Sequence, residues 1–411
     1  MKKALKILAA AVSMSLAVLT PASAAPEEET VSNAYLHLDG AMDEWAAAPA
    51  LRLPSSYHGG HLDSWNNSVI YDDALVIIAY ANRKDNADSL ERAKNMGDAF
   101  LQMQAKDPIG DGRVRNSYGP ENLFDADGVP NILSTGTAAG NQAWAGMALA
   151  HLAHVTKDAK YRDGALRVGE WLLRETSDSR GTGGFTAGYG ANGEKMAWNS
   201  TEHNIDMVGL FGMLHQLTND HKWRHARKHA RKFVKSMWDK EEGRFHIGSK
   251  ADGVTINRDE YIPEDVQSWG YLALQSERYR RALDWNIANL EVTDNSNPSL
   301  PVVGVRFAWQ INPKQPEKND DTVWLEGTAH MALALRVSGK KKHTQKAGVY
   351  LDSIHKEQLY GPNADGKGIQ ANSREGFSGG DDKSHTSLHT GATAWYIMAK
   401  QELNPFHLAK K

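Results

Sequence analysis

The chain of 411 residues contains no cysteine. This absence excludes disulfide bonds, a cysteine nucleophile and any zinc or iron–sulfur centre held by thiolates. The chain also lacks a basic excess, because 47 Lys and Arg stand against 50 Asp and Glu and the formal charge is −3. Binding of nucleic acid usually needs such an excess, so we expect no nucleic-acid partner. Without disulfides, the fold must depend on a large core, which a chain of this length can bury.

Long apolar runs are missing too, except at the N-terminus. There, Lys2 and Lys3 precede an apolar run over residues 5–19, and the small residues 22–24 follow it. This order is typical of a secretory signal peptide. A retained membrane anchor is the alternative, although the run is short for one. We therefore predict a signal peptide at residues 1–24, a secreted or periplasmic protein, and no membrane insertion after cleavage.

The rest of the chain alternates two kinds of helical segment. Helices that are apolar on nearly every face are buried, whereas amphipathic helices lie at the surface. The alternation therefore predicts helical hairpins, each with one inner and one outer member. The apolar segments are 72–81, 141–154, 202–217, 264–274, 322–337 and 385–400. The amphipathic segments are 87–105, 160–175, 221–240, 276–290 and 344–358.

The inner segments recur about every 60 residues, which is the mark of a repeat architecture. Six inner helices favour closure into a ring, and an open solenoid is the alternative. Five outer helices follow them, and we expect the sixth around residues 43–50, after an acidic leader at 26–30. The sequence thus predicts an all-α fold, an (α/α)6 toroid of six helical hairpins that forms one catalytic domain at 25–411.

The connections fall into two length classes. Links from an inner to an outer helix are short, such as 156–159 and 218–220, and links from an outer to the next inner helix are long. Long loops are usually functional. They must all gather at the end of the ring where the inner helices begin. In one of them, 241–261, we expect a small β-hairpin.

Polar and acidic residues stand at the starts of these apolar helices, where burial makes them costly. The fullest example is the stretch with Trp198, Glu202, His203 and Asp206, whose two acids share one helical face. If the ring closes, the residues at all six helix starts face one cleft, which predicts an active site lined by carboxylates. The others are Tyr71, Asp72, Asp73, Asn141, Gln142, Trp144, Asp265, Gln267, Trp269, Asp321, Trp324, Glu326 and His389.

This pattern resembles the (α/α)6-barrel, or six-hairpin, glycosidase superfamily, and within it secreted bacterial members. The segments that carry the resemblance are Tyr71-Asp72, 198–206, 265–270 and 324–329. The resemblance implies carbohydrate chemistry: a glycoside hydrolase that cleaves a poly- or oligosaccharide, with inversion at the anomeric carbon. It names no single family within the superfamily.

Hydrolysis of a glycosidic bond needs a proton donor and a second carboxylate. Burial against Trp198 should raise the pKa of Glu202, so we predict Glu202 as the general acid. Asp72 or Asp265 is the expected base. We expect the remaining residues to bind substrate: Asp206 and Glu326 by orienting hydroxyls, Trp144, Trp269 and Trp324 by stacking on sugars, and with them Tyr71, Asp73, Asn141, Gln142, Trp198, His203, Gln267, Asp321 and His389.

Other readings stay open at this stage. A polysaccharide lyase would use a Tyr or His base, but acids outnumber basic residues at the expected mouth. A sugar epimerase would use histidine pairs, and a non-catalytic glycan-binding toroid would use none of this chemistry. His385 and His389 have the spacing of a metal pair, yet no third ligand is obvious. We expect a monomer without metal or cofactor.

Overall fold

The computed structural model describes residues 27–45, 51–312, 314–379 and 383–409. The predicted signal peptide lies outside these residues. Within them, no helix combines the length and the hydropathy needed to cross a bilayer.

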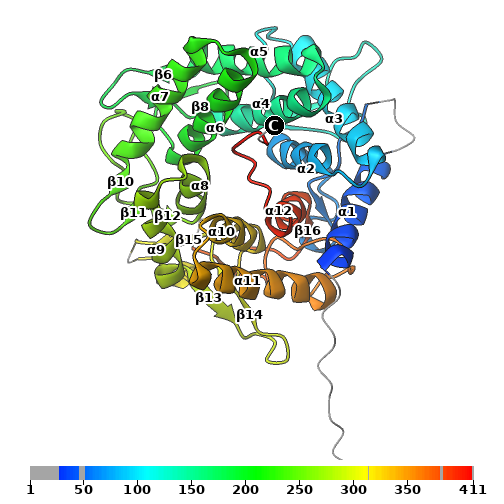
Figure 1. Cartoon of the computed structure of the whole chain (residues 1–411). Coiled ribbons are helices and arrows are strands. Elements are labelled where there is room, and N and C mark those ends of the chain that lie inside the picture. The colour runs from blue at the N-terminus through cyan, green and yellow to red at the C-terminus, as the bar shows by residue number, and fades with distance from the viewer. Residues whose placement is uncertain (1–26, 46–50, 313, 380–382, 410–411) are drawn as a thin grey trace, which may run out of the picture.

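The helices form two concentric rings (Figure 1). Each inner helix packs against the next, and α12 packs against α2, so the inner ring closes. The predicted toroid is confirmed, because a closed ring of this kind leaves no end for an open solenoid. The inner helices are α2 (Ile70–Asn82), α4 (Ala139–Thr156), α6 (Thr201–Thr218), α8 (Asp265–Leu274), α10 (Leu325–Val337) and α12 (Thr390–Lys400). Five of the outer helices are α3 (Ala87–Lys106), α5 (Ala159–Thr176), α7 (His221–Ser236), α9 (Arg281–Asn289) and α11 (Lys341–Tyr360).

The sixth outer helix is α1 (Glu27–Asp43), which packs against α12. The expectation of a leader at 26–30 was therefore wrong at residues 27–30, which are helical, and residues 46–50 of the helix expected at 43–50 lie outside the described residues. Tyr35, Leu38 and Met42 are buried and recur at helical spacing, so one face of α1 covers the inner ring. The Tyr35 hydroxyl donates to the Ala79 carbonyl of α2 at 3.1 Å. The polar residues between these positions conceal the stripe in the sequence.

Local sequence explains the short links. The inner helix α4 ends at Lys157, which has a left-handed backbone (φ 61°), and the side chain of Asp158 then caps α5. In the next hairpin Asn219 (φ 56°) ends α6 and Asp220 caps α7. A left-handed residue ends a helix and an aspartate begins one. Two adjacent residues therefore reverse the chain from the inner to the outer ring.

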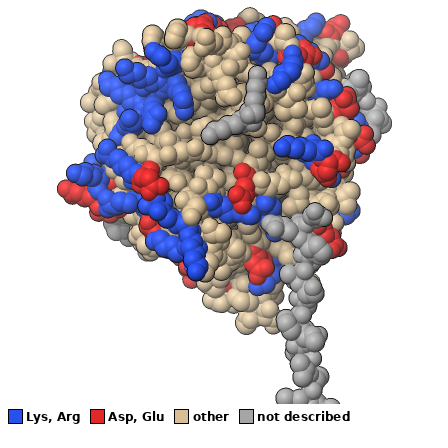
Figure 2. Space-filling model, viewed as in Figure 1, with Lys and Arg blue, Asp and Glu red and all other residues tan. Residues whose placement is uncertain are grey.

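The outer helices keep their charges at the surface. On α7, Trp223, Ala226, Ala230 and Phe233 are buried, and the opposite face is basic. Figure 2 shows Lys and Arg gathered over the region of this helix. The exposed basic residues are Lys222, Arg224, Lys228, Lys232 and Lys235.

The long links carry short strands at the end of the ring where the inner helices begin, which we call the open end. The expected hairpin at 241–261 is only partly correct, because 244–245 pairs with 238–239 while Ser249 bridges Ile256. Two pairs matter for the site: β1 (Tyr57–His58) with β16 (Leu388–His389), and β12 (Tyr261–Pro263) with β15 (Ala308–Gln310). The other strands are 68–69, 117–118, 132–134, 137–138, 177–178, 184–185, 188–189, 195–196, 238–239, 244–245, 291–294 and 302–305.

The other end of the ring, where the inner helices finish, is closed by the C-terminal segment (Figure 1). The Asn404 side chain donates to the Leu272 carbonyl at 2.9 Å, and the Pro405 carbonyl lies 3.0 Å from His151 Nε2. Phe406 is buried against the inner ring. The long links and their strands therefore leave the open end as the place for a site.

Candidate active site

The inner helices share a polar residue near their start that holds the preceding loop. The side-chain amide of Asn204 pairs with the backbone of Phe185, at 3.0 Å to its N–H and 2.9 Å to its carbonyl. Gln267 holds Phe245 in the same way at 2.7 and 3.0 Å, and Gln142 accepts from the N–H of Val114 at 3.2 Å. Gln142 and Gln267 are fully buried, so the structure uses these two predicted substrate ligands to fix loops.

The other three inner helices have a holding residue at the equivalent position. Thr328 accepts from the Val305 N–H at 3.1 Å, Thr393 accepts from the Ile369 N–H at 2.9 Å, and the Asp73 carboxylate accepts from Ser68 at 2.8 Å. Asp73 is therefore another predicted ligand that is buried and engaged in holding the structure. Two residues before each holding residue stands the position that faces the lumen: Tyr71, Gly140, Glu202, Asp265, Glu326 and Gly391.

The two glycines in this layer make room for neighbouring side chains. A Cβ at Gly391 would lie 2.4 Å from Asp72 Oδ1, and one at Gly140 would lie 2.5 Å from His203 Cδ2. Neither approach is possible without a shift of the neighbour. The layer therefore consists of three acids and one tyrosine, and the side chains of Asp72 and His203 occupy the room beside the two glycines.

Glu326 is the most strongly held of the three acids. Tyr71 donates to its Oε1 at 2.7 Å, and Trp395 Nε1 in turn donates to the Tyr71 hydroxyl at 2.8 Å. His389 Nδ1 lies 3.4 Å from Oε2, and His330 Nε2 lies 3.5 Å from Oε1. Burial raises the pKa of Glu326, but His330, His389 and Tyr71 outweigh burial and leave that pKa below its ordinary value. Glu326 is therefore ionised at neutral pH.

Glu202 has the opposite environment. Burial raises its pKa to about 7, with His330 lowering it and the charge of Glu326 raising it. Across the described residues, no hydrogen bond holds its carboxyl group. At neutral pH a large fraction of Glu202 therefore carries a proton that can be donated.

Asp265 and Asp206 also have pKa values well above the ordinary range. For both, burial is the main cause, and the charge of Glu202 adds to it. Neither carboxyl oxygen of Asp206 has a hydrogen-bond partner in the part of the chain that the structure describes. The raised pKa of Asp265 favours its protonated form, which makes it a weaker candidate for the general base than Glu326.

Two histidines connect the acids. His389 Nε2 lies 3.1 Å from Asp72 Oδ1, and burial, which lowers its pKa, is outweighed by Asp72 and Glu326, which raise it. His330 Nδ1 lies 3.3 Å from Glu264, whose other carboxyl oxygen accepts from Asn286 at 3.1 Å. His330 is not among the site residues predicted from the sequence. Its position four residues after Glu326, on the same face of one helix, is the signal that could have found it.

One helical turn below the acids, aromatic rings fill the lumen. The ring centroids of Trp144 and Trp269 are 5.3 Å apart, those of His330 and Trp395 are 4.3 Å apart, and Phe406 lies 5.3 Å from Trp144 on the side of the closed end. Trp144 is 1 % and Trp269 3 % exposed. Both therefore belong to the floor of the site, and their predicted stacking on sugars stays a prediction.

Two pockets open above this floor, and Tyr261 lines both. The first, which we call the Glu326 pocket, has a volume of about 490 Å³. Its lining includes Tyr57, Phe307, Trp324, Glu326, Asn372, His385 and His389. The second, which we call the Trp198 pocket, has a volume of about 550 Å³. Its lining includes Trp198, Ser249, Lys250, Asn257, Asp259 and Glu260. Most of these residues were not predicted from the sequence, because they come from the long links, which have no periodic pattern. They are Tyr57, Ser249, Lys250, Asn257, Asp259, Glu260, Tyr261, Phe307 and Asn372.

Of the predicted site residues, only Trp198, Trp324, Glu326 and His389 line these pockets, so the predicted catalytic residues Glu202, Asp72 and Asp265 line neither. Three predicted ligands outside the pockets have other surroundings. Asn141 donates to Asn116 at 3.0 Å, and Asp321 pairs with Arg306 at 3.2 Å. His203 is next to the Trp198 ring, at 6.0 Å between centroids, and burial lowers its pKa to about 4. Among the described residues, no group of three or more His, Asp or Glu side chains is arranged to hold a metal.

No protein-family model matches the chain, and no curated protein matches it in sequence. Solved structures do match. A D-mannose isomerase has a TM-score of 0.67 and 10 % identity, over 93 % of this chain and 99 % of its own. A sugar epimerase from a ruminal bacterium has a TM-score of 0.64 and 13 % identity, over 90 % and 98 %. A family 76 glycoside hydrolase from a bovine Bacteroides thetaiotaomicron strain has a TM-score of 0.61 and 11 % identity, over 91 % and 78 %. The resemblance to the six-hairpin glycosidase architecture is thereby confirmed at the level of the fold.

Proposed function

We propose that the protein is a glycoside hydrolase that cleaves a poly- or oligosaccharide. The observation that carries this proposal is a pair of interacting carboxyl groups at the starts of two inner helices, whose pKa values are displaced in opposite directions. The pKa of Glu202 is raised to about 7, and that of Glu326 is lowered. A displaced pair of this kind assigns one acid and one base at neutral pH.

In the proposed reaction, Glu202 gives its proton to the glycosidic oxygen as the bond from that oxygen to the anomeric carbon breaks. Glu326 removes a proton from water as the water oxygen bonds to the same carbon. Tyr71 and His389 hold the Glu326 carboxylate in place. Glu326 thus takes the role that the sequence analysis gave to Asp72 or Asp265, and Asp72 supports His389. We propose inversion as the stereochemical outcome, which proton NMR of the first-formed anomer would test.

A screen of polysaccharides tests the proposal. Starch, cellulose, mannan, xylan, β-1,3-glucan and chitosan are incubated with the enzyme, and the products are separated by chromatography and weighed by mass spectrometry. We expect hydrolysis of at least one polymer, and strong loss of activity in Glu202→Gln and Glu326→Gln. Wild-type rates in both folded variants would overturn the assignment. An unsaturated product that absorbs in the ultraviolet would identify a lyase instead.

A sugar epimerase or isomerase is the second candidate. The observation that favours it is His389, which lines the Glu326 pocket, is held by Asp72 and has a raised pKa. An imidazole in this place could remove a proton from the carbon next to a carbonyl group and return it to that carbon or to the former carbonyl carbon. Proton NMR of mannose, glucose and cellobiose incubated with the protein separates the two candidates. A new epimer or ketose without hydrolysis would favour the second.

We also propose that the protein is exported. The support is the order of basic, apolar and small residues at 1–24. Expression of the full chain in a bacterium, followed by mass spectrometry of the periplasm and medium, should find a chain that begins at Ala25. A full-length chain retained in the cytoplasm would overturn this proposal.

A further inference from the structure

The Trp198 pocket borders the helix start that carries Glu202. Its loop is fixed there, because the Thr201 N–H donates to the Ile247 carbonyl at 2.9 Å and Ser200 forms a β-bridge with Gly248. The far side of the pocket ends at Tyr261, in the strand that leads into α8. The pocket therefore lies against α6, on the side of the proposed proton donor.

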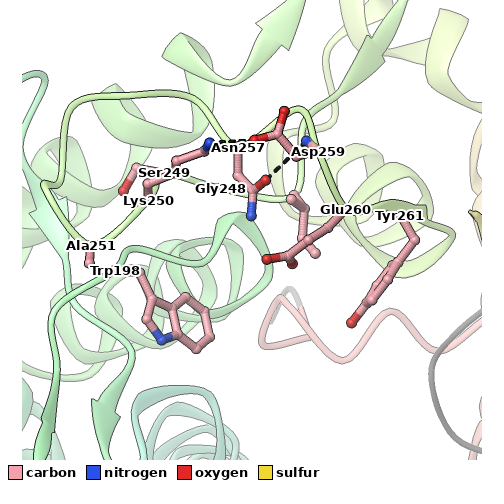
Figure 3. Close-up of a pocket in the computed structure, with 10 residues that line it drawn as sticks. Trp198, Gly248, Ser249, Lys250, Ala251, Asn257, Asp259, Glu260 and Tyr261 are labelled. Carbon is pink, nitrogen blue, oxygen red and sulfur yellow. Dashed lines mark hydrogen bonds and ion pairs between the residues drawn. The ribbon is translucent and has the colours of Figure 1, made fainter. Parts of the chain in front are cut away.

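The lining of this pocket suits a sugar. Trp198 is 39 % exposed and offers an open ring, unlike the buried tryptophans of the floor. Figure 3 shows the Glu260 carboxyl group between the Trp198 and Tyr261 side chains. Within the described part of the chain, no hydrogen bond or ion pair engages that carboxyl group. An apolar ring beside free hydrogen-bonding groups is how proteins commonly hold the two faces of a sugar.

The charges of the pocket restrict the kind of sugar. Lys250 forms an ion pair with Asp259 and also interacts electrostatically with Glu260. One cation therefore stands beside two acids, which leaves a net negative charge at the pocket. A sugar carboxylate would be repelled by Glu260, whereas a hydroxyl or an ammonium group could bind to it. The pocket therefore fits a neutral or amino sugar and disfavours a uronic acid.

The Glu326 pocket lies on the side of the proposed base. Glu326 and His389 line it, and Tyr261 is the wall that it shares with the Trp198 pocket. A proton donor must face the leaving oxygen, and the base must face the anomeric carbon. The two pockets therefore differ in the part of the substrate that they can hold.

We propose that the Trp198 pocket binds the leaving-group sugar and the Glu326 pocket binds the sugar whose anomeric carbon is attacked. This inference rests on the proposed hydrolase function and states which pocket binds the sugar on each side of the cleaved bond. The substrate then has at least two sugar units, with a neutral or amino sugar on the leaving side.

Two substrates with the same attacked sugar test this direction. One is the shortest oligosaccharide that the polysaccharide screen shows to be cleaved. The other is the glycosyl fluoride of its attacked sugar, in which a fluoride replaces the leaving-group sugar. In Trp198→Ala we expect kcat/KM for the oligosaccharide to fall about tenfold, as for the loss of one aromatic contact. We expect kcat/KM for the fluoride to stay within about twofold of wild type, because a fluoride makes no contact with that ring.

Trp309→Ala is the matched control, because Trp309 has the same 39 % exposure and lines neither pocket. This control should leave both rates unchanged. Equal losses on the two substrates in Trp198→Ala, or no loss on either, would overturn the inference while leaving hydrolysis itself established.

If the wild type cleaves nothing in the screen, the hydrolase proposal fails. A binding experiment then tests whether the Trp198 pocket is a sugar site. Saturation-transfer NMR with maltotetraose, cellotetraose, mannotetraose and xylotetraose would then be recorded on wild type, Trp198→Ala and Trp309→Ala. Contact that only Trp198→Ala loses would retain the pocket as a sugar site. No contact in the wild type, or equal contact in all three proteins, would overturn it.

Discussion

The two ends of the ring are built from the same six inner helices, yet buried carboxyl groups gather at one end and aromatic rings fill the other. At the open end, the lumen-facing layer holds Glu202, Asp265 and Glu326. One turn further in, the layer is aromatic, and Phe406 covers it from the closed end. A buried carboxyl group whose pKa is raised destabilises the fold, which a purely structural core would avoid. In the lumen-facing layer, Glu202 and Asp265 carry this cost at the open end, where the loops leave the two pockets.

The largest expected effect is the loss of activity when the ionised acid, Glu326, is replaced. Glu326→Gln keeps the size of the side chain and its contact with Tyr71 but cannot accept a proton from water. We expect kcat/KM to fall by about 10³ or more on both the oligosaccharide and the glycosyl fluoride. Steady-state kinetics of a variant with a wild-type circular dichroism spectrum measure this. Asp321→Asn, at a surface acid that lines neither pocket, is the control and should act as wild type.

Removal of the protonated acid should be more selective. Glu202→Gln should lower kcat/KM on the oligosaccharide by about 10²–10⁴. The loss on the fluoride should be much smaller, because fluoride leaves without a proton. The wild type should lose activity as the pH rises through about 7, since Glu202 is active in its protonated form. An equal loss on both substrates, or an alkaline limb that survives in Glu202→Gln, would contradict its role as donor.

Substitutions in the aromatic floor should lower the free energy of unfolding and leave the catalytic rate of the folded protein nearly unchanged. Phe406→Ala removes a buried ring that packs on Trp144 and Trp269, and we expect it to cost about 3–5 kcal/mol in the free energy of unfolding. Urea denaturation measures the loss, and activity per folded molecule should change little. In contrast, Trp198→Ala should change stability by less than about 1 kcal/mol, because the ring is largely exposed. A large activity loss in folded Phe406→Ala would show that the two ends are coupled.

The sequence predicts the ring well and the site only coarsely, for a physical reason. Burial on all sides makes the inner helices apolar throughout, and that pattern is visible without a structure. The same all-round burial hides which face of each helix meets the lumen. Gln267 and Glu202 are equally polar in the sequence, yet one holds a loop and the other faces the cleft. Trp269 and Trp198 also look alike in the sequence, yet Trp269 is buried in the floor and Trp198 has an exposed ring.

The repeated holding residue supplies the missing register. Once Asn204 and Gln267 are seen to bind the backbone of the preceding loop, the position two residues earlier identifies the lumen-facing side chain. Sequence spacing alone does not reveal this, because the six holding residues are of four different types. The pairing of Glu326 with His389 also depends on ring closure, since α10 and α12 bring together residues far apart in the chain.

The smallest expected effect concerns the contact that tunes Glu326. Tyr71→Phe removes the hydrogen bond to its carboxylate and keeps the ring in the cleft. This bond favours the ionised form, so its loss should raise the pKa of Glu326. Since Glu326 acts as a carboxylate, the acidic limb of the pH profile should move to higher pH by up to about one unit. Activity at neutral pH should fall less than about tenfold. Tyr35→Phe is the control, because it removes a buried tyrosine hydroxyl that bonds to the Ala79 carbonyl, away from both pockets. An acidic limb that stays in place in Tyr71→Phe, or moves equally in Tyr35→Phe, would show that the limb does not report Glu326.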